Sequence, residues 1–239
     1  MTESIQIETT PLRALLGGEA ALIRPWTDSW VPRRITLCLA TILVGAGLYG
    51  AAMGYWRSPQ QACYVAIKFP LIILLTTIGN ALLNAMLAPL LGLNLRFRQS
   101  LLAVLMSFTI ASAILGSFSP LIAFMVWNSP PMGSSPSAAQ AYAVIQLTHV
   151  LVIAFAGVTA NLRLMQLLRT FSGQARIARR VLFAWLIGNL FLGSQLSWIL
   201  RPFIGSPGLP VQFLRPNAFH GNFYETVFNS LLQILNLNP

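Results

Sequence analysis

Five apolar stretches, each long enough to cross a bilayer, alternate along the chain with shorter polar connections. About 20 helical residues at 1.5 Å each span the roughly 30 Å of hydrocarbon in a membrane. The pattern therefore predicts an all-α fold, a polytopic bundle of five transmembrane helices that fills residues 35–200. The predicted spans are residues 35–54, 62–88, 101–127, 141–161 and 181–200.

The two ends of the chain are more polar than the predicted bundle. Residues 1–34 read as a cytoplasmic amphipathic segment, in which Thr10 before Pro11 is a helix N-cap signal. That segment is either a short helix on the membrane surface or a partly ordered tail. Residues 201–239 are too polar and too rich in proline to span again, so we expect an external tail. Within it, residues 222–236 are predicted to form an interfacial amphipathic helix.

The distribution of positive charge predicts the orientation. The chain has 15 Lys and Arg against 5 Asp and Glu, for a net charge of +10. Cytoplasmic connections of membrane proteins carry the excess of basic residues, which places the N-terminus inside and the C-terminus outside. We expect the membrane to be the inner membrane of a bacterium. We expect the basic segments to contact anionic lipid headgroups and not nucleic acid. Eleven of the basic residues fall in three such segments: Arg13, Arg24, Arg33 and Arg34; Arg96 and Arg98; Arg163, Arg169, Arg176, Arg179 and Arg180.

Polar residues inside the second span are candidates for function. Lys68 is ionisable, and ionisable residues within spans are functional hypotheses by default. It lies near the external end of its helix, however, and its long stem is expected to carry the ammonium to the headgroups. Thr76, Asn80 and Asn84 recur every four residues and predict a polar stripe that faces protein and not lipid.

Other spans contribute a histidine and a face of small residues. His149 follows Gln146 by three residues, and a single imidazole is not a metal site, so we expect a buried, hydrogen-bonded histidine. Ala46, Gly50 and Gly54 form a small-residue face that predicts close packing against another helix.

Catalytic patterns are missing from the sequence. No carboxylate occurs between positions 29 and 224, which excludes a proton relay through Asp or Glu inside the spans. Nucleophile-elbow, Walker, dinucleotide, haem-attachment and zinc signatures are also absent. We therefore expect no enzymatic activity and no cofactor.

Residues 10–200 resemble the Yip1-like group of five-span membrane proteins. The stretch from Ala62 to Leu93, followed by Leu95-Arg96-Phe97-Arg98-Gln99-Ser100, is similar to that group's apolar second helix and the polar entry to its third. The final 40 residues, with Arg201-Pro202-Phe203-Ile204-Gly205-Ser206-Pro207, depart from the group. The resemblance implies a non-catalytic organiser or accessory protein of a membrane.

Three functions remain open on the sequence alone. The first is a scaffold or accessory subunit that packs against other membrane proteins or against itself. The second is a small permease or channel subunit whose pathway passes Asn80, Asn84, Lys68 and His149. The third is lipid handling at the outer face by the tail and Arg201. A water-accessible cavity lined by those side chains would favour transport, whereas tight packing around them would favour the scaffold.

Overall fold

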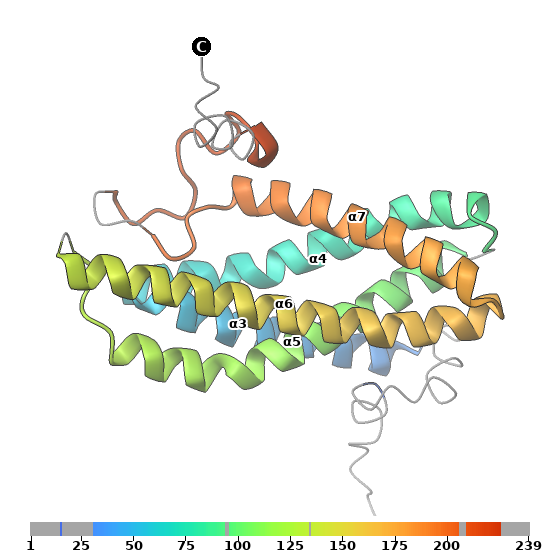
Figure 1. Ribbon diagram of the computed structural model, residues 1–239, viewed down its shortest axis with the longest axis horizontal. Coiled ribbons are helices and arrows are strands. Elements are labelled where there is room, and N and C mark those ends of the chain that lie inside the picture. The colour runs from blue at the N-terminus through green and yellow to red at the C-terminus, as the bar shows by residue number, and fades with distance from the viewer. Residues whose placement is uncertain (1–14, 16–30, 94–95, 134, 206–208, 226–239) are drawn as a thin grey trace, which may run out of the picture.

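The described part of the chain is a bundle of five long helices (Figure 1). A computed structural model describes residue 15 and residues 31–93, 96–133, 135–205 and 209–225. All five helices are long and apolar enough to cross a membrane, which confirms the predicted all-α chain with five candidate spans among the described residues. The helices are α3 (Pro32–Tyr55), α4 (Pro59–Leu90), α5 (Phe97–Trp127), α6 (Pro136–Ser172) and α7 (Ala175–Ile199).

Successive helices run in opposite directions, so the bundle has two distinct ends (Figure 1). The tail end is where α4 and α6 begin and where α7 leads into residues 200–225. The arginine end is the opposite one, where α4 and α6 finish and α5 and α7 begin. Most of the predicted N-terminal segment and most of the predicted helix at 222–236 lie outside the described residues.

Local signals in the sequence set several helix ends. Ser58 precedes Pro59 and caps α4, because its Oγ accepts a hydrogen bond from the backbone N–H of Gln61 at 3.1 Å. Ser135 caps α6 in the same way, with Pro136 as the first helical residue. At the other end of α6, Gly173 adopts a φ of 63°, a left-handed conformation that favours glycine and stops the helix.

The helices extend further than the hydropathy pattern predicts, most of all at the arginine end. The fourth span was expected to end at residue 161, but α6 continues to Ser172, and only Gly173 and Gln174 separate it from α7. The basic residues of this region are therefore mostly helical rather than in a long connection. Arginine lowers the hydropathy of a segment but is a good helix former. A drop in hydropathy therefore marks where the apolar span ends, and the helix itself can continue beyond that point.

Close backbone packing around α3 confirms the predicted small-residue face. Ala46, Gly50 and Gly54 are all buried. A Cβ added at Gly50 would lie 2.6 Å from the carbonyl oxygen of Val65 on α4, so no side chain fits there. On the other side of α3, a Cβ added at Gly116 of α5 would lie 2.8 Å from the Cα of Gly45. Small residues thus let α3 pack tightly against both α4 and α5.

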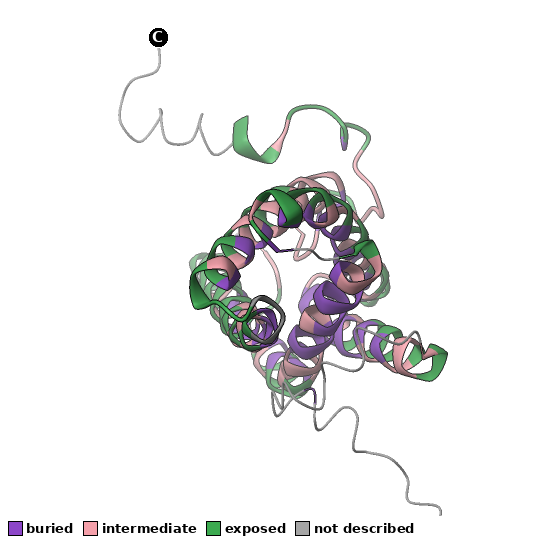
Figure 2. Cartoon of the chain, turned by 90° about the vertical axis from the view of Figure 1, so that its right-hand side faces the viewer, coloured by how far each residue is buried: buried purple, intermediate pink, exposed green. Residues whose placement is uncertain are grey.

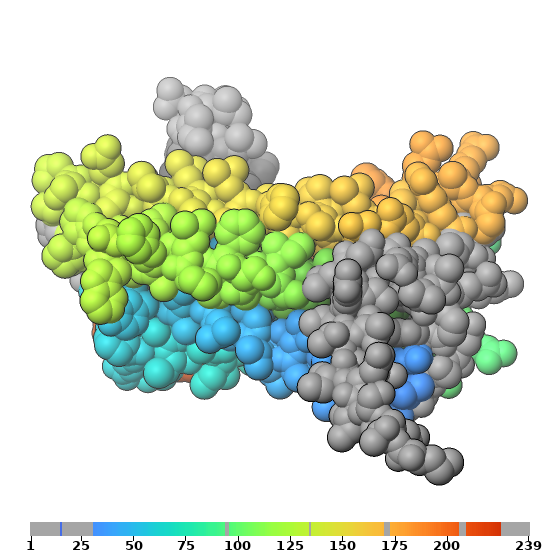
Figure 3. Space-filling model, turned by 90° about the horizontal axis from the view of Figure 1, so that it is seen from below, coloured from blue at the N-terminus to red at the C-terminus, as the bar shows by residue number. Residues whose placement is uncertain are grey.

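The outside of the bundle is apolar. Buried residues lie on the sides that helices turn towards each other, and exposed residues lie on the outer sides (Figure 2). Helices α5 and α6 run beside each other along one face (Figure 3). Helix α7 packs mainly on α4 and α6, and its outward residues, such as Phe183 and Leu190, are exposed. Such a surface suits contact with lipid or with other membrane helices.

Candidate functional site

The polar stripe of α4 faces α7. Thr76, Asn80 and Asn84 are all buried, which confirms the expectation that the stripe faces protein. The amide nitrogen of Asn80 donates to Oδ1 of Asn189 at 2.6 Å and to the backbone oxygen of Trp185 at 3.3 Å. The stripe therefore joins two helices through residues that are more than 100 positions apart in the chain.

The interface around the stripe is closed. A Cβ added at Gly188 of α7 would lie 2.6 Å from Oδ1 of Asn80, and one added at Gly79 would lie 2.9 Å from Leu192. Asn84 is fully buried, and neither its amide nitrogen nor its oxygen has a hydrogen-bond partner among the described residues. A buried polar group without a partner costs about 1–3 kcal/mol, so this asparagine does not stabilise the bundle through hydrogen bonding.

His149 pairs with a tyrosine on another helix. Its Nδ1 lies 2.8 Å from the hydroxyl oxygen of Tyr49, and the two rings meet edge to face with centroids 5.4 Å apart. Both residues are buried, as expected for the histidine, whereas Gln146 is exposed and does not join them. The imidazole Nε2 has no partner among the described residues.

Lys68 is enclosed by protein, so it does not reach the headgroups as the sequence suggested. It is 0% exposed, and its Nζ donates to the backbone oxygen of Pro202, 3.0 Å away. Gln61, two turns earlier on α4, donates from Nε2 to the same oxygen and to that of Phe203, both at 2.9 Å. The Phe213 ring centroid lies 5.1 Å from the Lys68 Nζ. The prediction that the Lys68 ammonium reaches the headgroups is wrong, because the chain after α7 folds back and supplies the Pro202 oxygen as its partner.

The segment after α7 is held at the tail end by side chains of other elements. Nη2 of Arg57 donates to the backbone oxygen of Leu209 at 3.0 Å. Arg201, the tail arginine singled out in the sequence, stacks its guanidinium 3.6 Å from the ring centroid of Trp198 and donates to the Trp198 oxygen at 2.7 Å. Backbone that is not helical is tolerated beside a membrane bundle when its polar groups are satisfied by protein. Gln61 and Lys68 donate the hydrogen bonds that the backbone oxygens of Pro202 and Phe203 need.

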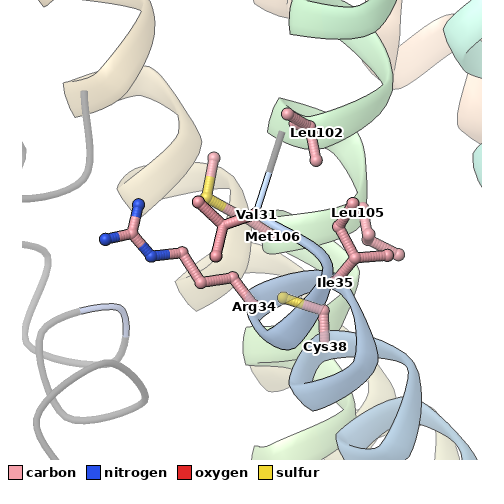
Figure 4. Close-up of a pocket in the computed structure, with 7 residues that line it drawn as sticks. All are labelled: Val31, Arg34, Ile35, Cys38, Leu102, Leu105 and Met106. Atoms are coloured by element: carbon pink, nitrogen blue, oxygen red, sulfur yellow. The ribbon is translucent and has the colours of Figure 1, made fainter. Parts of the chain in front are cut away.

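Two hollows lie on α3 and α5. The smaller has a volume of about 10 Å³, room for at most about one water molecule, and lies near the arginine end (Figure 4). Cys38 lines it together with Leu102, Leu105 and Met106 of α5, while the Arg34 guanidinium points away (Figure 4). The larger hollow, named the α3–α5 groove below, is an open surface depression of about 460 Å³. It is lined by Ala40, Thr41, Val44, Gly45, Leu48, Ala113, Gly116 and Ser117.

Sequence reasoning missed four residues that complete these sites. Gln61 shares a face of α4 with Lys68, and that seven-residue spacing was the available signal. Tyr49, Trp185 and Asn189 lie on other helices, and the sequence does not show which helices pack together.

No family model, curated protein or solved structure matches the chain. The class of the protein therefore rests on its architecture, which is that of a multi-pass helical membrane protein. The resemblance to the Yip1-like group stays a prediction.

Proposed function

We propose that the chain is a non-catalytic membrane protein that acts by packing against other membrane proteins, as a scaffold or accessory subunit. The α3–α5 groove carries this proposal. Its floor is made of small residues, where Gly45 and Gly116 bring the two helix backbones together. Small residues at a membrane-facing surface let another helix approach closely, which strengthens van der Waals packing between helices.

The groove has the shape and polarity to receive a transmembrane helix. Val44 and Leu48 form one wall and are 60% and 55% exposed, so they offer apolar contact area. The hydroxyls of Thr41 and Ser117 donate to carbonyl oxygens of their own helices, at 2.8 and 2.9 Å. The groove therefore presents no unsatisfied donor, and an apolar helix with small residues of its own would fit it.

The alternative of a permease is less well supported. Lys68, Asn80, Asn84 and His149 are each between 0% and 3% exposed, so water has little access to any of them. Asn80 and Lys68 bind partners on different elements and do not line a common path. We further propose that the arginine end faces the cytoplasm of a bacterial cell and the tail end faces outwards, following the excess of arginine.

Site-specific photo-crosslinking in native membranes tests the scaffold. A photoreactive phenylalanine analogue at Ser117, on the exposed edge of the groove, is expected to give a discrete protein adduct. The same analogue at Val150 of α6, an exposed apolar position outside the groove, is the matched control. Mass spectrometry of the adduct would distinguish a second copy of the chain from another subunit. Adducts to lipid alone at Ser117, or equal protein adducts at both positions, would contradict the proposal.

A further inference from the structure

Four basic residues gather at the tail end, and one carboxylate of the described residues lies there with them. Of the five acidic residues in the sequence, Glu225 is the one that the structure describes, and its Oε2 accepts a hydrogen bond from Asn222. Within the described residues, none of the four cations forms a salt bridge. These cations are Arg57, Lys68, Arg201 and Arg215.

Three of the four meet around one short segment. Lys68 binds the oxygen of Pro202, the residue directly after Arg201. The same Nζ lies 5.1 Å from the centroid of the Phe213 ring, and Arg215 follows two residues later. The fold thus brings a buried ammonium against the backbone directly after Arg201 and near the ring of Phe213, two residues before Arg215.

The charges of these residues repel one another. Burial, and then the nearby positive charge of Arg215, lower the pKa of Arg201, and Arg215 also repels Lys68. An arginine side chain does not lose its proton in proteins, so deprotonation of Arg201 or Arg215 cannot relieve the repulsion. A bound anion would relieve it.

The two arginines have donors to offer such an anion. Arg215 is partly exposed, and its guanidinium makes no hydrogen bond or ion pair with any described residue. Arg201 uses Nη1 for the Trp198 oxygen, and stacking on the indole fixes the plane of its guanidinium. By contrast, the two Nη atoms of Arg57 already bind the oxygen of Leu209 and Sδ of Met132.

We propose that Arg201 and Arg215, backed by the buried charge of Lys68, form a binding site for an anionic phosphate group. Guanidinium groups match the geometry of phosphate oxygens, with two parallel N–H donors for each pair of oxygens. The phosphate belongs either to the headgroup of an anionic lipid or to a soluble phosphate ester. The site is independent of the α3–α5 groove and of the scaffold proposal.

Native mass spectrometry of the full chain in mild detergent tests the lipid source. Phosphatidylglycerol is the anionic probe, and phosphatidylcholine with the same acyl chains is the zwitterionic control. Arg215→Gln removes the charge-assisted hydrogen bonds to the phosphate, so it is expected to weaken the tightest phosphatidylglycerol binding by about tenfold or more. Arg57→Gln removes one charge at the same end, and its effect is expected to stay within about twofold because its guanidinium is already engaged.

The second arm uses glycerol 1-phosphate with the delipidated protein and records the melting temperature. A rise that Arg215→Gln abolishes and Arg57→Gln keeps would identify a soluble phosphate ester as the ligand. No rise, together with the tenfold loss of lipid binding in Arg215→Gln, would identify the lipid headgroup. Equal effects of the two substitutions, or no preference for either anionic probe, would overturn the site. Arg215→Lys keeps the charge but loses the paired donors, so its binding should fall between that of the unaltered protein and that of Arg215→Gln, and this graded order separates loss of ligand contacts from misfolding.

Discussion

The hydroxyl of Tyr49 on α3 and Nδ1 of His149 on α6 lie 2.8 Å apart in the buried interior. Helix α3 packs chiefly on α4 and α5, so this hydrogen bond links it to a helix that is not among its main neighbours. A single polar contact of this kind adds little packing area, but it fixes how the two helices are placed relative to each other.

Tyr49→Phe is expected to destabilise the bundle by about 1–3 kcal/mol, because Nδ1 of His149 is left buried without a partner. The loss should appear as a lower melting temperature in detergent. Tyr142→Phe is the matched control, since the Tyr142 ring packs at a tilt against Trp56 and its hydroxyl has no partner among the described residues. A similar drop in both variants would show that the Tyr49 hydroxyl bond is not the cause.

Gly50→Ala is expected to cost about 1–3 kcal/mol, because the added Cβ meets the backbone oxygen of Val65 at 2.6 Å and forces α3 and α4 apart. Gly157→Ala on α6 adds the same methyl group where nothing lies within 4 Å, and should be neutral or stabilising by up to about 1 kcal/mol. Melting temperatures of the two variants check this pair. Equal stability would remove Gly50 from the packing core.

Asn84→Leu should leave the melting temperature unchanged or raise it, because both polar atoms of this buried side chain lack partners among the described residues. Asn80→Leu should lower it, since Asn189 loses its hydrogen bond across the α4–α7 interface. The test is whether Asn84→Leu has the higher melting temperature of the two variants. A larger loss for Asn84→Leu would mean that this amide binds a group outside the described residues.

Gln61→Leu is expected to loosen the segment after α7 more than Lys68→Met does. The oxygen of Pro202 keeps one donor in either variant, but the oxygen of Phe203 loses the single side-chain donor that the described residues provide. Hydrogen exchange of residues 209–218 should therefore rise most in Gln61→Leu. Gln60→Leu, an exposed change at the neighbouring position, should leave exchange unaltered. Faster exchange in Lys68→Met than in Gln61→Leu would show that Lys68, and not Gln61, contributes more to holding the segment after α7.

The proposed orientation predicts which connections react with a membrane-impermeant maleimide in intact cells. With Cys38 and Cys63 replaced by Ala, a cysteine at Ser129 in the tail-end connection should be labelled from outside. A cysteine at Gln174 in the arginine-end connection should be labelled only after the membrane is permeabilised, because basic connections stay in the cytoplasm. The reverse pattern would contradict the orientation.

The sequence predicts the number and order of the spans because each long apolar run has one explanation in a membrane. It also predicts the burial of Asn80 and Asn84, since an amide facing lipid is costly and their spacing puts them on one face. It does not predict their neighbours. Hydrophobic pattern describes a helix on its own, so nothing in it pairs Asn80 with Asn189 or Tyr49 with His149.

Lys68 also shows that a helix considered alone does not reveal its neighbours. Its position near the end of a span predicts, for that helix by itself, that the side chain extends to the headgroups. Its partner, Pro202, lies in the irregular segment after α7. The residues of that segment show no helical or strand periodicity, so the sequence pattern does not predict the path of its backbone. The small-residue face of Gly50 and Gly54 was easier to predict, because glycine spacing within one helix already specifies a face.

The hydrogen bond between Lys68 and Pro202 also sets an order of events during biosynthesis. The two residues are 134 positions apart, so the ribosome makes the lysine long before its acceptor exists. At about 5–20 residues per second this interval lasts roughly 7–27 s. During that time α4 must either hold its ammonium at the membrane surface or delay its full insertion. Lys68 can thus gain its final hydrogen-bond acceptor only after the last helix has been synthesised.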